Sequence, residues 1–320
     1  MDTLSDILSL LRPSEFMFRG LEAAEPWSLQ FPATDGIRCY SLLSGQCWLV
    51  VDAIPAPIRL ECGDCVLLTK NQAFRMTSDP ALRSTDALSL FSEAQAGGVA
   101  ICNGGGDLAG VGGYFKFADH HAGLLLNLLP AVVHISDASD KAALRASVEL
   151  MMQELRAPKP GGYLVARHLA HLMLVFALRL HLTTSEHGSV GWLCALGDKQ
   201  MAAVINAIHE EPAKAWTLQS LAQLACMSRS TFASRFKQVV GTPPMEYLVR
   251  WRMLLAGDRL RYSGNSIATI AASLGYESES AFRTAFKRVM GCSPRQYHLG
   301  SMQSDTTNNA RLTASQHANR

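Results

Sequence analysis

The chain has 320 residues, which is enough for two domains that each bury a sizeable core. We expect no secretory signal at its start, because Met1 is followed by acidic Asp2 and Asp6 instead of a basic segment. The most apolar later stretch, residues 163–182, holds two arginines and three histidines, too many polar groups for a bilayer span. We therefore expect a soluble cytoplasmic protein with no membrane partner, and we expect its eight cysteines to be thiols.

The overall formal charge of +2 conceals a division along the chain. Residues 198–300 contain 13 Lys and Arg against 7 Asp and Glu, whereas residues 1–197 contain 14 against 19. A basic module joined to an acidic one is typical of a protein in which only one half neutralises phosphates.

Short apolar runs separated by turns dominate the chain from about residue 27 to residue 135. Strands are expected at residues 39–43, 47–51, 58–60, 66–69 and 113–117. Many short strands at close spacing indicate a β-sandwich or a small barrel, and a barrel of this size can enclose one small ligand.

A metal-dependent enzyme is the alternative interpretation of such a barrel. A catalytic metal needs about three protein ligands, yet the first 130 residues hold only His120 and His121, which would point to opposite faces of a strand. We therefore expect no catalytic residues, no metal and no cofactor.

Cys62 and Cys65 form a Cys-x-x-Cys pattern around a Gly-Asp turn. Such a pair can serve as a thiol redox switch or a soft-metal site, and it can equally consist of small apolar side chains in a barrel wall. Both interpretations remain open.

Helical spacing returns between residues 140 and 183. Apolar residues repeat from Leu144 to Leu155, residues 158–162 (PKPGG) break the pattern, and the helix at 163–182 is apolar on most sides. So wide an apolar surface needs the barrel or a second copy of the chain as its partner. The polar segment that follows is expected to be a linker.

The end of the chain contains an internal duplication, residues 217–248 and residues 266–298. The copies share the pairs Phe232/Phe282, Phe236/Phe286, Gly241/Gly291, Pro244/Pro294 and Tyr247/Tyr297, at a constant offset of 50. Each copy predicts a helix, a tight turn and a second helix: Ser228 and Ser278 are expected N-caps, and Gly241 and Gly291 are expected ends. Two helices joined in this way suit a helix-turn-helix, whose second helix can enter a DNA major groove.

A single helix over residues 245–261 is expected between the two motifs. At 1.5 Å per residue it would be roughly 25 Å long. A stiff spacer of that length could set two recognition helices into successive major grooves, which are about 34 Å apart.

The duplicated region resembles the DNA-binding domain of the AraC/XylS family of bacterial transcription regulators. The segments that carry the resemblance are LAQLACMSRSTFASRFKQVVGTPP and IAASLGYESESAFRTAFKRVMGCSP. Residues 191–222 and 112–135 resemble the branch with an N-terminal cupin-type domain, so that only the last twenty residues lie outside the resemblance. Phe74, Val51 and Ala53 stand where the cupin pattern expects histidines, which favours a sensing role over metal chemistry.

The resemblance also implies which residues face DNA. In the first motif these are Arg229, Ser230, Thr231, Ser234 and Lys237, with Ala233 on the same side. In the second motif these are Glu279, Ser280, Arg283, Thr284 and Lys287. Arg283 is the expected guanine contact, because its fork can reach O6 and N7 together. Lys237, Lys287 and Arg288 are expected either to contact phosphates or to form a solvated face.

The expected fold is therefore multidomain α+β. Residues 1–135 form a cupin-like barrel that senses a signal, residues 136–183 a helical dimerisation or packing region, residues 184–197 a linker, residues 198–300 an all-α domain with two helix-turn-helix motifs, and residues 301–320 a disordered tail. The expected partners are double-stranded DNA, RNA polymerase, an unknown small-molecule effector and a second copy in a homodimer, and the expected outcome is activation of transcription. A redox-sensing regulator of the same architecture and a cupin-like enzyme with a DNA-binding domain remain as alternatives.

Overall fold

The computed structural model describes residues 3–10, 13–52, 54–93, 98–117, 129–136, 141–184 and 192–299. These residues divide into two compact units. Residues 13–117 and 129–184 form the sheet unit, whereas residues 3–10 and 192–299 form the helical unit. The His120–His121 pair, residues 185–191 of the linker expected at 184–197, and the tail at 301–320 lie outside the described residues, whereas residues 192–197 of that expected linker form a helix.

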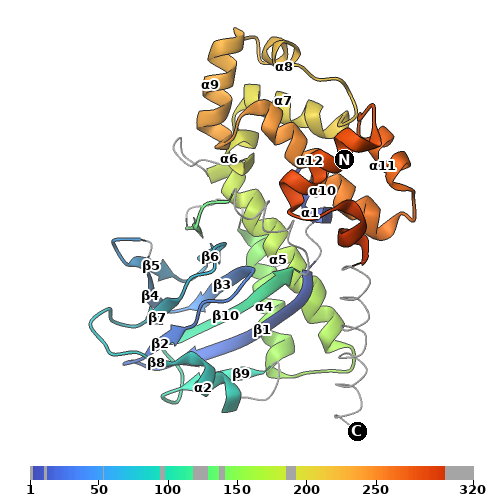
Figure 1. Cartoon of the computed structure of the whole chain (residues 1–320). Coiled ribbons are helices and arrows are strands. Elements are labelled where there is room, and N and C mark those ends of the chain that lie inside the picture. Colours follow the sequence, from blue (N-terminus) through green and yellow to red (C-terminus); the bar gives the residue numbers. More distant parts are fainter. Residues whose placement is uncertain are drawn as a thin grey trace. The chain divides into compact units, whose positions relative to one another are not determined.

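Two β-sheets build the sheet unit (Figure 1). The first has the strand order β11-β6-β3-β10-β1-β9, and the second has the order β5-β4-β7-β2-β8. The strands are β1 (Pro13–Ala23), β2 (Ser28–Phe31), β3 (Ile37–Ser44), β4 (Gln46–Val51), β5 (Ile58–Glu61), β6 (Cys65–Leu68), β7 (Phe74–Thr77), β8 (Thr85–Asp86), β9 (Val99–Cys102), β10 (Leu108–Phe117) and β11 (Val132–Ile135). All five expected strands are present, and β10 begins five residues earlier than its apolar run.

Side chains alternate between the two faces of the six-stranded sheet, as they do in any strand. Its inner face meets the second sheet: Tyr40 of β3 packs with its ring centre 5.2 Å from that of Phe74 on β7. Phe31 of β2 stacks on the same Phe74 ring at 4.7 Å. The two sheets therefore enclose one apolar core, to which nearly every strand contributes.

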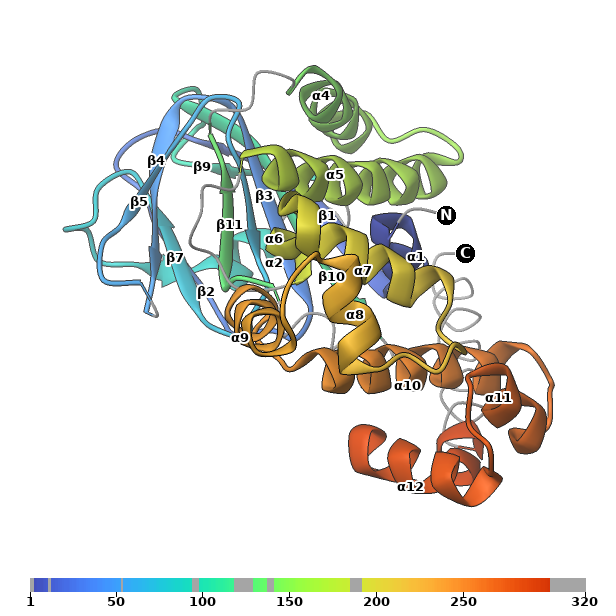
Figure 2. The same cartoon turned by 90° about the horizontal axis from the view of Figure 1, so that it is seen from above.

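Two helices, α4 (Ala142–Arg156) and α5 (Gly162–Thr184), pack together across the outer face of this sheet (Figures 1 and 2). The stretch Gly162–His181 of α5 is long and apolar enough to cross a bilayer by length and composition alone, and 39% of it is buried. Since α5 lies against α4 and strands β1, β6 and β11, its buried apolar residues, which include Leu169, Met173 and Leu174, belong to the core of the sheet unit. A shorter helix, α2 (Ala87–Glu93), lies beside β2 and β9.

Asp64 ties the β5–β6 turn to the start of α4. Its carboxylate accepts a hydrogen bond from the Glu61 backbone amide at 3.0 Å, lies 3.0 Å from Nε2 of His134 on β11, and forms an ion pair with Lys141 at 3.4 Å. The residue is only 7% exposed. Because a buried charge is costly unless it is paired, this network holds the turn, β11 and the helix pair in one arrangement.

The helical unit consists of short helices around a long one. They are α1 (Thr3–Leu10), α6 (Trp192–Gly197), α7 (Lys199–Glu210), α8 (Leu218–Leu224), α9 (Arg229–Val240), α10 (Pro244–Tyr262), α11 (Ile267–Ser273) and α12 (Glu279–Met290). Helix α10 runs between the α8–α9 pair and the α11–α12 pair (Figure 2). The helix expected at 245–261 is therefore present and one residue longer at each end.

The helix at the very start of the chain is part of the helical unit. Helix α1 packs on α7 and α10, with Leu4, Ile7 and Leu10 buried. The Thr3 hydroxyl donates a hydrogen bond to Oδ1 of Asn206, 2.5 Å away on α7. The sequence placed residues 1–135 in one domain, whereas the compact units group α1 with the helices that begin 190 residues later.

A buried histidine lies in the centre of the helical unit. His209 of α7 is 7% exposed, its Nε2 lies 2.8 Å from the Tyr247 hydroxyl, and its ring stacks on Trp251 with centres 3.7 Å apart. Burial lowers the pKa of His209 to about 3. The imidazole is therefore neutral in the folded chain at ordinary pH.

Candidate nucleic-acid interface and interior pocket

Helix α9 presents the first candidate interface. Ser228 caps it by accepting a hydrogen bond from the Thr231 amide, and Gly241 ends it at a φ of 83°. Phe232, Phe236 and Val240 are buried on one side. The expected residues Arg229, Ser230, Thr231, Ser234 and Lys237 are all exposed, and the last four lie away from the buried side.

Helix α12 repeats this arrangement. Ser278 caps it through the Ala281 amide, Gly291 ends it at a φ of 77°, and Phe282 and Phe286 are buried. The exposed side carries the expected residues Ser280, Arg283, Thr284, Lys287 and Arg288, with Glu279 half-buried. Thus, in each copy of the duplication, the predicted contact residues lie on one helix, and all of them except half-buried Glu279 are exposed.

The turn before α9 differs from the turn before α12. Cys226 adopts a left-handed conformation with a φ of 54°, whereas Gly275 holds the corresponding place with a φ of 77°. A Cβ atom on Gly275 would lie 2.1 Å from the Ala213 carbonyl oxygen, so only glycine fits there. Cys226 is exposed, which spares its side chain such a contact.

Two hydroxyl groups of the expected set are engaged within their own helices. The Thr231 hydroxyl lies 2.8 Å from the Ser228 hydroxyl, inside the cap of α9. The Thr284 hydroxyl donates to the Ser280 carbonyl oxygen at 3.1 Å. Both hydroxyls can still accept a hydrogen bond, because each oxygen has two lone pairs.

Arg235, which the sequence did not single out, anchors α9 to the start of α7. Its guanidinium donates to Oδ2 of Asp198 at 2.7 Å and to Oε1 of Gln200 at 3.0 Å. Burial raises the pKa of Asp198, but the Met201 amide, Arg235 and the Gln200 amide together lower it below its ordinary value. Asp198 therefore caps α7 and fixes α9 as a carboxylate.

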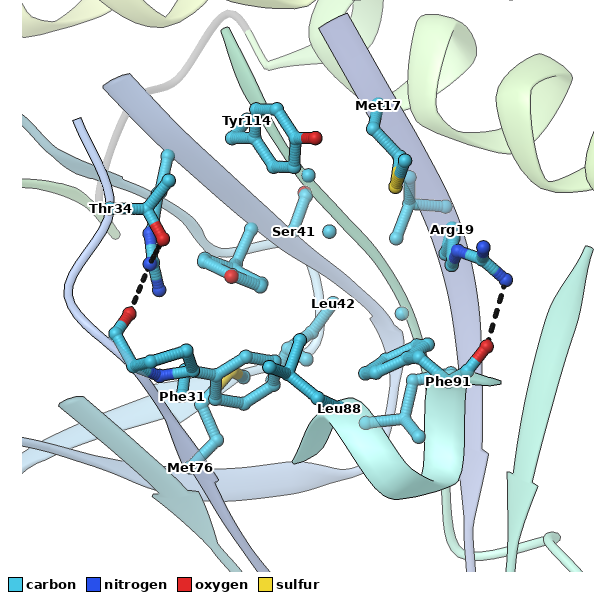
Figure 3. A pocket seen from close by; sticks show the side chains of 18 of the residues that line it. Met17, Arg19, Phe31, Thr34, Ser41, Leu42, Met76, Leu88, Phe91 and Tyr114 are labelled. Carbon is cyan, nitrogen blue, oxygen red and sulfur yellow. Dashed lines mark hydrogen bonds between the residues drawn. The ribbon is translucent and has the colours of Figure 1, made fainter. Parts of the chain in front are cut away.

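The sheet unit contains an apolar pocket of about 150 Å³ between its two sheets (Figure 3). Its floor is the inner face of β10, where Gly110 lies between Leu42 and Leu21, and Gly112 lies between Tyr40 and Arg19. Two glycines in succession on one face leave a hollow in the sheet. A Cβ atom on Gly112 would lie 2.3 Å from the Tyr40 ring.

The opposite wall of the pocket is apolar and comes from the second sheet and α2. It consists of Phe31, Met76, Leu88 and Phe91. Arg19 extends across one side of the pocket and donates through Nη1 to the Phe91 carbonyl oxygen at 3.0 Å (Figure 3). Arg38 and Tyr114 line another part. Burial and a hydrogen bond to Glu15 raise the pKa of Tyr114 to about 12, so its hydroxyl is neutral.

The thiols near the Cys-x-x-Cys pattern occupy different surroundings. Cys62 is exposed and donates to the Leu43 carbonyl oxygen at 3.0 Å. Cys65 is buried, with its sulfur 3.8 Å from that of Cys39 on the neighbouring strand. The hydrogen bond to Cys65, together with burial, raises the pKa of the Cys39 thiol well above its ordinary value. Among the described residues, no cluster of three or more His, Cys, Asp or Glu side chains could hold a metal ion.

Comparison with known proteins agrees with this architecture. Residues 2–183 match a cupin family, and residues 221–299 match a helix-turn-helix domain family. The chain is 40% identical over 280 residues to a putative AraC-like transcription regulator of Streptomyces lividans, which covers 87% of this chain and 92% of the relative. It is 30% identical over 288 residues to the HTH-type transcriptional regulator AlkR of Acinetobacter baylyi, covering 87% and 93%.

Among solved structures, the helical unit is similar to the DNA-binding domain of AdpA, a global transcriptional factor, in complex with a target DNA. The identity is 33%, the match covers 31% of this chain and 89% of that chain, and the TM-score is 0.30.

A cupin-type domain followed by two helix-turn-helix motifs defines a DNA-binding transcription regulator. The chain belongs to the AraC-like family of these regulators. The family and the fold class expected from the sequence are therefore confirmed. The relatives are transcription regulators, which points to a protein that is not an enzyme.

Proposed function

We propose that this regulator reads a two-part DNA site through the exposed sides of α9 and α12, and that a small molecule bound in the pocket of the sheet unit controls this binding. The observation that supports DNA reading is that α9 and α12 have the same cap, the same buried phenylalanines and the same terminal glycine, and that each exposes basic side chains. Helix α10, with 19 residues and a length of about 28 Å, is a stiff connection between the two motifs.

The two helices carry different side chains, so they should read different sequences. Arg229, Ser230 and Ser234 face outward on α9, whereas the outward side of α12 carries Glu279, Ser280, Arg283 and Thr284. One molecule should therefore bind unlike half-sites in a fixed direction. Genome-wide occupancy of the protein tests this idea, because the shared sequence of the bound promoters should be directional, and a palindromic half-site pair within one molecule's footprint would contradict it. The neighbouring genes would also show whether transcription rises, as we expect, through contact with RNA polymerase.

Ligand sensing rests on the pocket. Its glycine floor and apolar wall form a partly open apolar space in a unit that contains no cluster of metal-ligating side chains among its described residues. The test is DNA affinity of the full-length protein with and without small organic acids, amides and amines of six to seven carbons. Gly112→Ala should abolish any response, since the added methyl group overlaps the Tyr40 ring and so changes two residues that line the pocket, and it should leave DNA affinity without ligand unchanged. A response that survives Gly112→Ala would place the sensor elsewhere.

A homodimer is the expected assembly. Helix α5 exposes apolar side chains at 45–64% of their surface: Tyr163, Leu164, Val165 and Leu172. Exposed apolar clusters of this kind favour a protein partner, and a second copy of the cytoplasmic chain is the one we propose. Sedimentation of the wild type and of Leu164→Glu/Leu172→Glu tests it, with the double variant expected to be monomeric.

A further inference from the structure

One buried positive charge lies on the inner face of the six-stranded sheet. Arg38 of β3 is 6% exposed, and its guanidinium carbon lies 4.9 Å from the centre of the Phe74 ring on the facing sheet. Its side chain is therefore inside the sheet unit, where it forms part of the pocket lining.

The groups that contact this guanidinium are neutral. Its Nη2 donates to the Pro32 carbonyl oxygen and to Oγ1 of Thr34, and the Tyr40 hydroxyl is within hydrogen-bonding reach. Burial raises the pKa of Tyr40, so this hydroxyl does not supply a counter-charge. Across the described residues, no carboxylate forms an ion pair with Arg38.

A buried guanidinium without an anion is an unusual arrangement. Hydrogen bonds to neutral oxygens and the Phe74 ring satisfy some of its donors and part of its charge. They do not replace the solvation that an ion loses on burial, and proteins normally supply a carboxylate in such places. An anion that entered the pocket would provide the missing negative charge, and its pairing with the guanidinium would be strong because the surroundings have a low dielectric constant.

The rest of the pocket restricts what the anion carries. The floor is bare glycine backbone, and the facing wall of Phe31, Met76, Leu88 and Phe91 offers only apolar contacts. A cavity of about 150 Å³ is the size of an apolar protein cavity that holds one benzene molecule. Sugars and other polyhydroxylated molecules would leave their hydroxyl groups without partners against this wall.

We propose that the effector is a small organic monoanion, with a carboxylate that pairs with Arg38 and an apolar body of about one aromatic ring or a short alkyl chain that packs against the aromatic wall. This inference rests on the proposed sensing function and adds the chemical class of the ligand. Arg38 is a specificity-determining residue, because it selects the charged member among molecules of equal shape.

Isothermal titration calorimetry on the full-length protein tests the inference with two matched series: benzoate, benzamide and benzylamine, and hexanoate, hexanamide and hexylamine. The wild type should bind the carboxylate of at least one series about 10- to 100-fold more tightly than its amide, the range expected for a hydrogen-bonded charge, and should reject the amine. This comparison needs no variant and therefore cannot fail through misfolding.

Arg38→Met keeps the apolar stem and removes the charge but leaves Arg19 at the side of the pocket, so it should reduce the preference for the carboxylate and leave amide binding within about twofold. Arg59→Met is the matched control, since Arg59 is exposed on β5 of the same unit and bonds to Gln46. It should change neither affinity.

The outcomes separate the two proposals. Equal or tighter binding of the amides by the wild type would overturn the anionic class while leaving a pocket sensor intact, and so would an unchanged carboxylate preference in Arg38→Met. Absence of binding by every member of both series contradicts the size and charge assigned here. Carboxylate binding that leaves DNA affinity unchanged would support the ligand class and defeat the sensing role.

Discussion

Nε of Arg283 donates a hydrogen bond to Oε1 of Glu279, 2.7 Å away and one turn earlier on the exposed side of α12. The pair is an i, i+4 ion pair, and neither side chain is buried. Such pairs contribute little to stability, about 0.3–0.5 kcal/mol on a helix surface. We propose that its importance lies in orientation, because the contact holds the arginine fork in one place and Arg283 is the proposed guanine contact.

We expect Arg283→Ala to relax base preference at one position of the site at a cost of about 1–3 kcal/mol for the preferred base, since a bidentate contact to guanine is lost. Lys287→Ala should weaken binding to all sequences alike. It should also reduce the slope of the logarithm of the binding constant against the logarithm of the salt concentration by about one in magnitude. Affinities for specific and scrambled DNA at several salt concentrations distinguish the two. Equal losses on both DNAs for both variants would show that the roles are wrongly assigned.

Glu279→Ala should also reduce the preference for specific over scrambled DNA, although Glu279 acts only through Arg283. Without the carboxylate, Arg283 must be ordered when it meets the base, which costs side-chain entropy. Affinity for scrambled DNA should stay constant or rise slightly, because a negative charge leaves a surface that faces phosphates. The same binding assay provides the measurement, and Glu246→Ala, which breaks a similar pair with Arg250 on α10, is the control. Loss of specificity in the control to the same degree would contradict the orienting role.

His209 should make the stability of the helical unit pH-dependent. Its folded pKa of about 3 lies below the unfolded value of about 6.5, so below pH 6.5 the unfolded chain binds a proton that the folded chain does not. Stability should therefore fall as pH decreases from 6.5 towards 3, by on the order of 1.4 kcal/mol per pH unit. Urea unfolding followed by tryptophan fluorescence measures it. His209→Gln keeps a polar partner for Tyr247 and should show a smaller loss over the same range, whereas parallel curves would refute the assignment.

The two thiol interpretations make different predictions for chemical labelling. Cys62 and Cys226 are exposed, whereas Cys39 and Cys65 are fully buried and the pKa of the Cys39 thiol is raised. Brief treatment of the native protein with iodoacetamide should modify Cys62 and Cys226 and spare Cys39 and Cys65, as read by mass spectrometry. If Cys62→Ser/Cys65→Ser then abolishes a response to oxidant while DNA binding persists, a redox sensor replaces the ligand sensor.

Asp64→Ala should destabilise the sheet unit by about 2–4 kcal/mol, because it leaves the His134 and Lys141 side chains and the Glu61 amide without their common acceptor. Asp52→Ala, at an exposed position after β4, is the matched control and should cost less than about 0.5 kcal/mol. Chemical denaturation of each variant measures the difference. A loss no larger than the control's would show that the network contributes nothing.

The sequence predicted the helix-turn-helix motifs closely because their signals are local. Caps at Ser228 and Ser278, left-handed glycines at 241 and 291, and buried phenylalanines at fixed spacing determine each motif within some 30 residues. The sequence contains no comparable signals at the ends of β1, β2, β7, β9 and β11, and these strands were not predicted. In β1, charged Glu15, Arg19 and Glu22 interrupt the apolar pattern, because neighbours far away in the chain decide which positions are buried.

The pocket could not be found from the sequence for the same reason. It arises where β10 pairs with β3 on one side and β1 on the other. The paired residues of β3 lie about 70 residues before those of β10, and the paired residues of β1 lie about 90 residues before them. Two signals were nevertheless present: Arg38 interrupts an apolar strand, and glycines at 110 and 112 repeat with the period of one strand face. Neither signal predicts a pocket by itself, because only the strand register shows that Arg38 and the two glycines lie on the same face of the sheet.

The position of α1 has a consequence for biosynthesis. Its partners α7 and α10 begin some 190 and 240 residues later, so α1 leaves the ribosome long before the helices on which it packs. At about 5–20 residues per second, its apolar side is without its partners for roughly 10 to 50 s. The nascent sheet unit therefore emerges behind an apolar segment that has not yet met its partners, and α1 can complete the core of the helical unit only after α7 and α10 have been made.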